Sequence, residues 1–418
     1  MAEYTDNFSQ ADENPLSSGG VWDTYAGIGN LQAVGNKVRA VTLGGADSFE
    51  TYNGFTPGND QFAQITISTW NATTNVATII AGVFLRAAAP STHTAYRIQA
   101  QVGALGASPI VQLSRINAGV NTDLTSASTS FVAGDILTGM IRGSTMFAFK
   151  NSTLIASFTD GTPIASGRIG AEVYIGVGGS LTDVEIDDFV GGDIRKTRFY
   201  LPNTGAAEIS PAFTLESSWT ATTNADRITM VRSRISSTMA TKAQAAPGTA
   251  GGQKWLFRQY VSKPLAAGDV FGALFGQIRG LESAANDNID AISLKVLVVK
   301  ADATLRGTLL ALANYGTVAE LATSLRNKII ANGDGLTKVT ALDGDRIVAE
   351  IGLTNTANGT SVSGSLSFGD DSATDLAEDE AATAANNPWL EFVGVNLMSQ
   401  LLQQGVFVNQ AVKRASYY

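Results

Sequence analysis

Residues 134–170 read GDILTGMIRGSTMFAFKNSTLIASFTDGTPIASGRIG, and this stretch decides the fold of the first half of the chain. It contains three short runs of strand-forming residues: Ile136–Arg142, Thr145–Lys150 and Thr153–Phe158. Gly143 and Asn151 follow the first two runs, and both residue types tolerate the left-handed backbone that tight turns between antiparallel strands require. The stretch therefore predicts a β-meander, in which consecutive strands pair with one another.

Strand patterns continue on both sides of the meander. Gln61–Trp70 alternates polar and apolar side chains, whereas Ala77–Leu85 is almost continuously apolar, which is typical of an inner strand. Further strands are expected at Tyr96–Val102, Ile110–Ile116 and Leu181–Val190. Because many short strands follow one another with no helical pattern between them, we expect residues 1–194 to form a β-sandwich or barrel.

The first half resembles the concanavalin A-like, laminin G-like sandwich family. The similarity lies in the Gly134-Asp135 entry, the meander and its closing Gly167–Gly170 strand, and it departs at Asn151-Ser152, where Asn-Gly is commoner. Asp6-Asn7-Phe8 and Asp187-Asp188-Phe189 also match as the two ends of such a domain. The resemblance implies a jelly-roll-like sandwich whose first and last strands lie together.

The second half is expected to be another β-sandwich. A boundary is predicted near Gly191-Gly192-Asp193, so that residues 195–392 form a domain of their own. Its clearest strands are predicted at Val270–Ile278, Ile292–Val299 and Arg346–Leu353. An Ala- and Gly-rich stretch, Thr241–Gln253, is predicted to be a mobile loop. One inserted helix is predicted at Thr317–Ile330, where apolar side chains recur at helical spacing.

Residues 200–392 resemble a domain of bacteriophage particle proteins. The resemblance is carried by YLPNTGAAEISPAF at 200–213, RQYVSKPLAAGDVFG at 258–272, GQIRGLES at 276–283, LDGDRIVAEIG at 342–352, FGDDSATDL at 368–376 and NNPWLEF at 386–392. It implies a structural component of a virion, exposed on the particle as a head decoration or tail appendage. The implied partners are other virion proteins and copies of this chain, and the protein would be made in the host cytoplasm and released by lysis.

Residues 393–418 are expected to form a C-terminal segment or docking arm. Several of its side chains are apolar or aromatic and need a partner if the preceding domain ends at Phe392. The candidate docking residues are Val395, Leu401, Leu402, Phe407, Tyr417 and Tyr418.

Composition narrows the classes of function. Charged residues make up only 16% of the chain and its net charge is −9, which disfavours binding to nucleic acid. The start of the chain lacks the basic and apolar regions of a secretory signal, and no apolar run has the length of a membrane span. We therefore expect neither nucleic acid as a partner nor insertion into a membrane.

The strongest enzyme-like pattern is Glu185-Ile186-Asp187-Asp188-Phe189-Val190. Glucanases with this sandwich fold carry Glu-x-Asp-x-x-Glu on a strand, where alternate carboxylates share one face and serve as nucleophile and acid. Val190 replaces the last carboxylate here. We therefore interpret the pattern as an edge strand with solvent-facing acids, and we expect no enzymatic activity.

Other catalytic and metal patterns are incomplete. His93 is the only histidine and thus the one candidate base for a Ser-His-Asp triad, but it is expected on a surface loop and no Gly-x-Ser-x-Gly elbow accompanies it. Because there is no cysteine and only one histidine, thiolate sites and histidine-rich metal sites lack their residues. The Asp343-Gly344-Asp345 stretch has the composition of a turn rather than the spacing of a calcium loop. No cofactor is expected.

Tryptophans offer the best candidates for contact with sugars. Trp255 follows the predicted loop and is the best candidate for an exposed, glycan-stacking ring, whereas Trp22 and Trp70 are expected in the core. Three classes of function thus remain: a virion structural protein, a carbohydrate-binding adhesin that recognises a receptor or cell-surface glycan, and a degenerate hydrolase. The first class is the main expectation and the second is its alternative.

Overall fold

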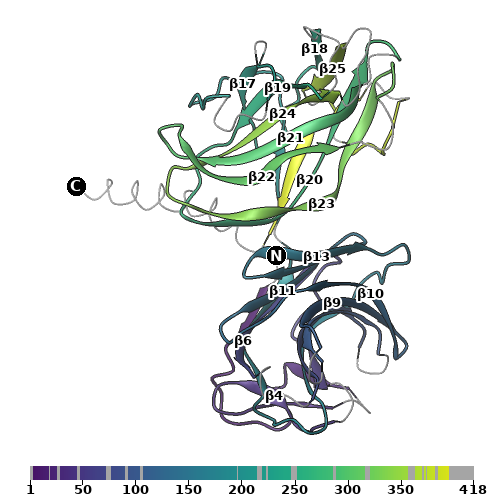
Figure 1. Ribbon diagram of the computed structural model, residues 1–418, viewed down its shortest axis with the longest axis vertical. Coiled ribbons are helices and arrows are strands. Elements are labelled where there is room, and N and C mark those ends of the chain that lie inside the picture. The colour runs from purple at the N-terminus through teal and green to yellow at the C-terminus, as the bar shows by residue number, and fades with distance from the viewer. Residues whose placement is uncertain are drawn as a thin grey trace, which may run out of the picture. The chain divides into compact units, whose positions relative to one another are not determined.

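The computed structural model describes most of the chain and divides it into two compact units, Met1–Ile194 and Arg195–Tyr418 (Figure 1). The residues that it describes are 3–17, 19–25, 29–44, 48–71, 77–89, 93–103, 107–194, 196–213, 219–222, 225–245, 252–285, 289–315, 321–355, 363–369, 371–372, 374–381 and 385–394. Within these ranges every regular element is a β-strand. The same ranges contain no helix with the length and apolar character that a membrane crossing requires.

The first unit contains two antiparallel sheets that pack face to face. Sheet 1 has the order β13 (Thr153–Thr159), β12 (Thr145–Lys150), β11 (Ile136–Arg142), β6 (Gln61–Trp70), β15 (Val184–Asp193), β4 (Val38–Ala40) and β3 (Leu31–Ala33), and β1 (Glu3–Asp6) pairs with β15. Sheet 2 has the order β10 (Val120–Ser128), β9 (Ile110–Asn117), β8 (Ala95–Val102), β7 (Ile79–Ala87), β14 (Arg168–Ile175), β5 (Ser48–Tyr52) and β2 (Trp22–Thr24).

The predicted meander is present as the consecutive neighbours β11, β12 and β13. Asn151 and Ser152, with φ of 50° and 71°, form the turn between β12 and β13, so Ser152 takes the left-handed position where glycine is commoner. The expected pairing of the two ends of the unit is also confirmed, because Asp6 on β1 lies opposite Phe189 on β15.

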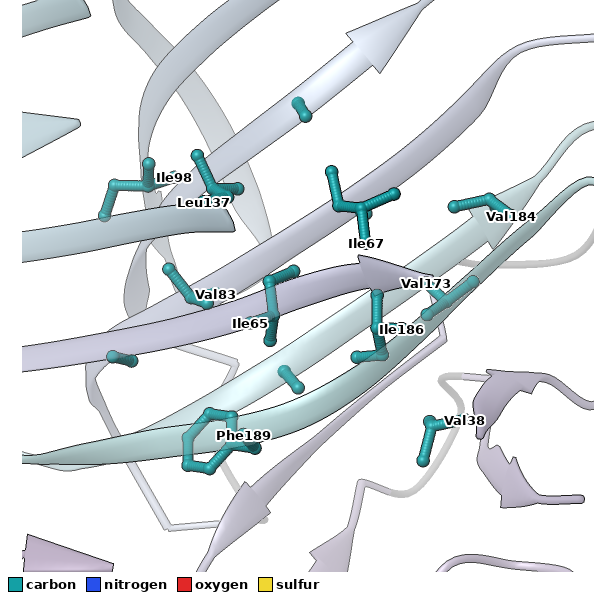
Figure 2. Close-up of a cluster of buried hydrophobic side chains, with 14 of the residues drawn as sticks. Val38, Ile65, Ile67, Val83, Ile98, Leu137, Val173, Val184, Ile186 and Phe189 are labelled. Atoms are coloured by element: carbon teal, nitrogen blue, oxygen red, sulfur yellow. The ribbon is translucent and has the colours of Figure 1, made fainter. Parts of the chain in front are cut away.

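The core of the first unit lies between its two sheets. Figure 2 shows side chains from sheet 1, such as Ile65, Ile186 and Phe189, beside Val83 and Val173 from sheet 2. Alternate residues of the same strands point away from this core. The outward positions of sheet 2 are the ones that bear on function.

The second unit is also built from two sheets. Sheet 3 has the order β16 (Lys196–Tyr200), β26 (Trp389–Val393), β20 (Gly268–Glu282), β25 (Ser363–Phe368) and β18 (Ala240–Ala245), and β23 (Arg326–Ala341) pairs with β20. Sheet 4 has the order β17 (Asp226–Thr229), β19 (Lys254–Val261), β24 (Arg346–Asn355), β21 (Ile289–Val299) and β22 (Leu305–Tyr315). Among the residues described, its strands pair antiparallel except β17 with β19, and Ala221 forms an isolated parallel bridge with Trp255.

The predicted inserted helix is wrong over the residues that are described. Leu321–Leu325 is irregular and Arg326–Ile330 begins strand β23, while residues 317–320 lie outside the described ranges. Ile330 pairs with Gly276 of β20, and a Cβ on Gly276 would lie 3.0 Å from the Ile330 side chain. Gly276 leaves space for the Ile330 side chain, and β20 offers backbone hydrogen bonds to this segment. Pairing with β20 therefore stabilises a strand more than the helical spacing of apolar residues stabilises a helix.

The predicted mobile loop Thr241–Gln253 is also wrong in its first part. Ala240–Ala245 forms strand β18, which pairs with β25 along its whole length. Residues 246–251 lie outside the described ranges. Small side chains suit this edge position because a strand needs backbone pairing more than side-chain packing there.

Candidate functional site

A row of polar side chains crosses the outward face of sheet 2. The strand registers place Glu172 of β14 beside Gly82 of β7, Gly82 beside Gln99 of β8, and Gln99 beside Gln112 of β9. A neighbouring row contains Arg97. Since successive residues of a strand point to opposite faces, these side chains all lie on the face away from the core.

Hydrogen bonds join these side chains across four strands. Arg97 Nη1 donates to Glu172 Oε1 at 3.3 Å, and Arg97 Nη2 donates to Asn121 Oδ1 at 3.3 Å. Asn121 Nδ2 donates in turn to Asp123 Oδ1 at 2.7 Å, and Ser114 Oγ donates to the same oxygen at 3.0 Å. We call this set the polar ladder; it runs from β14 to the edge strand β10.

Glutamines extend the polar ladder on its other side. Gln99 Nε2 donates to Gln101 Oε1 at 2.7 Å and to Gln112 Oε1 at 2.8 Å. Gln99 is buried, Gln101 and Gln112 are half-buried, and Asn121 and Asp123 are exposed. The ladder is therefore rooted in the sheet and presents amide and carboxylate groups to solvent near β9 and β10.

Gly82 allows the buried end of the polar ladder to form. A Cβ at this position would lie 2.8 Å from Glu172 Oε2 and 3.1 Å from the Ile98 carbonyl oxygen. Because glycine leaves that space open, the Glu172 side chain can reach across β7 to Arg97. Any larger residue at position 82 would displace this carboxylate.

Aromatic side chains cover the neighbouring part of the same face. Phe49 lies opposite Glu172, and its ring centroid is 4.4 Å from that of Phe84 and 4.6 Å from that of Tyr25. His93 stacks on Phe49 at 4.7 Å, so the expectation that this histidine is only a surface loop residue is incomplete. Burial raises the pKa of the Tyr25 hydroxyl, consistent with a phenol packed among other rings.

The carboxylates of the glucanase-like pattern have other contacts. Glu185 Oε2 accepts hydrogen bonds from Lys37 Nζ at 2.9 Å and Thr69 Oγ1 at 2.7 Å, and the residue is 8% exposed. Strand β15 is flanked by β6 and β4, so the interpretation as an edge strand is wrong. Asp188 has a φ of 47° and lies in a bulge between Asp187 and Val190, and this extra residue returns position 190 to the face of Glu185 and Asp187, where the pattern lacks its last carboxylate.

The tryptophan expected to stack on sugars is buried. Trp255 is 2% exposed and packs in the core of the second unit, so the expectation of an exposed ring is wrong. It lies on β19, where its inward position is fixed by pairing with Leu353 of β24. Trp22 is a core residue as expected, while Trp70 is half-buried and packs at the margin of that core.

Two groups of residues considered in the sequence remain: the Asp343–Asp345 stretch and the candidate docking residues. Asp345 is 2% exposed and accepts hydrogen bonds from the Arg306 side chain and from the backbone N–H of Leu342, as is usual for an aspartate in a turn. The candidate docking residues of the C-terminal segment lie outside the described ranges: Val395, Leu401, Leu402, Phe407, Tyr417 and Tyr418.

The polar ladder was not anticipated from the sequence, although a signal for it exists. Residues 96–102 read YRIQAQV, with Arg97, Gln99 and Gln101 at alternate positions. In a strand this alternation indicates one apolar face and one polar face. The partners Glu172 and Asn121 could not be found in the same way, because strand pairing brings them from distant segments.

The chain is similar only in a distant way to the known proteins considered below. No protein-family model matches the chain, and no curated protein matches it. The carbohydrate binding module CBM66 from Bacillus subtilis is similar over 41% of this chain and 92% of that chain, with 14% sequence identity and a TM-score of 0.31.

Two other solved structures are similar to about the same degree. Sheep galectin-11 is 13% identical over 35% of this chain and 96% of its own, with a TM-score of 0.25. The Bacillus licheniformis beta-glucanase is 12% identical over 46% of this chain and 99% of its own, with a TM-score of 0.33. None of these values supports an argument about activity, so the function has to be argued from this chain's own residues.

Proposed function

We propose that the protein is a non-enzymatic binding protein whose first unit binds carbohydrate on the outward face of sheet 2. The observation that carries the proposal is the polar ladder, whose solvent-facing amide and carboxylate groups are held in place by buried side chains of the same face. Sugars present hydroxyl groups that both donate and accept hydrogen bonds, and side-chain amides do the same. A few polar groups held in fixed positions give such ligands their orientation and specificity.

The accessible members of the polar ladder set where the sugar would lie. Gln101, Gln112, Asn121 and Asp123 reach solvent, whereas Glu172 and Arg97 are buried and hold the others in place. Because the glutamines are already oriented by Gln99, they lose little side-chain freedom when a ligand binds. The sugar would therefore contact β9 and β10 and the half-buried end of β8.

The surroundings of Glu185 support a binding role over hydrolysis. A retaining glycosidase needs two carboxylates about 5 Å apart, one of them free to transfer a proton. Glu185 is tied to Lys37 and Thr69, and Val190 occupies the outward position where the second carboxylate of the pattern would stand.

Glycan-array binding of the full chain tests the carbohydrate proposal. We expect the double variant Gln112→Ala with Asn121→Ala to lose the binding shown by the unaltered protein, while Thr153→Ala, at an exposed position on sheet 1, keeps it. Array binding that survives the double variant, or no binding to any glycan, would show that this face is not a carbohydrate site.

A second proposal concerns the place of the protein in a bacteriophage particle. The motifs quoted from the second unit meet in its structure: Arg258 Nη2 donates to Asn203 Oδ1 at 2.7 Å, and Trp389 Nε1 donates to Asp375 Oδ1 at 2.9 Å. The resemblance to phage particle proteins therefore involves residues that build this unit. We propose that the second unit attaches the chain to other virion proteins, so that the first unit is displayed on the particle.

Quantitative mass spectrometry of purified particles tests the second proposal. We expect the chain in a fixed copy number relative to the major capsid protein. Its absence from particles would overturn the virion proposal and leave the carbohydrate proposal standing.

A further inference from the structure

A pocket of about 290 Å³ lies in the second unit, and none of its lining residues belongs to the polar ladder. Phe199 and Met230 form its floor and are 2% and 1% exposed. Ile235 also lines the pocket and is 55% exposed, so its side chain is accessible to a ligand that extends beyond the buried residues. The remaining lining residues are Val231, Arg232, Ser233 and Lys263.

A replaceable ion pair lies beside the pocket. Lys263 Nζ contacts Glu208, and the two side chains are 65% and 43% exposed. Exposed pairs of this kind contribute only about 0–1 kcal/mol, so a ligand carboxylate can take the place of Glu208. Glu208 would not be left alone, because Arg346 Nη2 lies 2.6 Å from its Oε2 and the Arg346 side chain is only 10% exposed.

We propose that this pocket binds an acidic peptide segment of a partner protein. The segment would insert one large apolar side chain onto Phe199 and Met230 and place a neighbouring carboxylate on Lys263. The volume suits a single large side chain, and only a ligand that continues beyond the pocket would cover Ile235. These two features favour a peptide over a small molecule.

The charge of the site also disfavours one obvious occupant, the chain's own C-terminal segment. Residues 395–418 contain no aspartate or glutamate, and their charged residues are Lys413 and Arg414. Cations at this segment would be repelled by Arg232 and Lys263. The partner is therefore expected to be another protein with acidic and apolar residues side by side.

Methyl NMR of the full chain labelled at methionine gives a local readout. The probe is a capped tetrapeptide with one phenylalanine and three aspartates. We expect it to shift the Met230 methyl resonance and to leave those of Met140 and Met146, which belong to the first unit, unchanged. The same peptide with alanine for phenylalanine, or with lysines for aspartates, is expected to bind at least about tenfold more weakly, as loss of one anchoring contact implies.

Surface variants separate the two halves of the site. Ile235→Ser should weaken binding about tenfold and Lys263→Gln about fivefold at low salt, while Lys263→Arg should restore most of the affinity. Leu342→Ser is the matched control, because Leu342 is also an exposed aliphatic residue of the second unit, at 50% exposure, and does not line the pocket.

Several outcomes would overturn the proposal. They are an unshifted Met230 resonance at millimolar peptide, equal binding of the alanine or lysine peptides, and unchanged affinity in both Ile235→Ser and Lys263→Gln. A Met230 shift that depends on protein concentration without peptide would identify a second copy as the occupant. Phenylbutyrate binding as tightly as the acidic peptide would identify a small-molecule site instead.

Discussion

The Oε1 atom of Glu50 accepts a hydrogen bond of 3.2 Å from the backbone N–H of Leu31, and this bond joins the two sheets of the first unit. Glu50 belongs to β5 of sheet 2 and is fully buried, while Leu31 begins β3 at the edge of sheet 1. Burial raises the pKa of Glu50 to about 8, and the Leu31 N–H opposes that shift only in part. The side chain is therefore protonated at neutral pH.

This raised pKa predicts an unusual pH dependence of stability. The folded state holds a proton that the unfolded chain, with a glutamate pKa of about 4.3, has already released, so the free energy of unfolding falls as pH rises from about 4 to 8. We expect the first unit to lose a few kcal/mol, to order of magnitude, between pH 5 and pH 8.5 through this group. Glu50→Gln should remove that loss in denaturant titrations; equal slopes for both proteins would refute the assignment.

Arg86 holds together loops at one end of the first unit. Its guanidinium donates hydrogen bonds of 2.6–2.7 Å to the carbonyl oxygens of Asn59, Ile164 and Gly143, and the residue is 2% exposed. Arg86→Met would leave these acceptors without that donor, at a cost of about 3 kcal/mol. Thermal unfolding of the first unit should occur several degrees lower, and Arg86→Lys should recover only part of the loss. An unchanged midpoint in Arg86→Met would contradict the role.

Trp219 fastens the segment before β17 to sheet 4. Its Nε1 donates to Glu350 Oε2 at 2.7 Å, and a Cβ on Gly352 would lie 2.8 Å from the indole ring. Trp219→Phe removes a donor from a carboxylate that is 1% exposed, and we expect it to destabilise the second unit by about 1–3 kcal/mol in denaturant unfolding. The effect should shrink in a Glu350→Gln background, since the charge is then gone. A cost that is the same in both backgrounds would show that packing alone matters.

Glu185 is predicted to serve structure and not catalysis. We expect no release of reducing sugar from a broad panel of glycans by the unaltered protein. Glu185→Gln should weaken the contact with Lys37 and lower stability by about 1 kcal/mol, because that lysine is itself partly exposed. The decisive contrary result is turnover that disappears in this variant.

The two units are predicted to be independently stable. Limited proteolysis should yield protected fragments of about half the length of the chain, cut near the boundary between Ile194 and Arg195, because each unit has a core of its own. Mass spectrometry of the digest locates the cut. Loss of both fragments at the same rate as the intact chain, with none protected, would show a single cooperative unit.

The local geometry of the first unit can be predicted from short stretches of its sequence. Gly143 and Asn151-Ser152 fix the turns of the meander, and alternation fixes which side chains of Gln61–Trp70 face the core. These features depend on residues within a few positions of one another, so they can be recognised without the rest of the chain. Strand β10 was missed because Asn121, Thr122 and Asp123 are polar and exposed, as an edge strand permits.

Which residues share a face depends on how distant strands pair. Glu172 meets Arg97 from 75 residues away, Leu31 meets Glu50 across the two sheets, and Arg326–Ile330 forms a strand because β20 lies beside it. The helical spacing of apolar residues favoured a helix at Thr317–Ile330. The predicted loop Thr241–Gln253 favoured an exposed ring for Trp255, which follows it. Both expectations failed for one physical reason: backbone pairing and burial against distant strands contribute more free energy than local preference does.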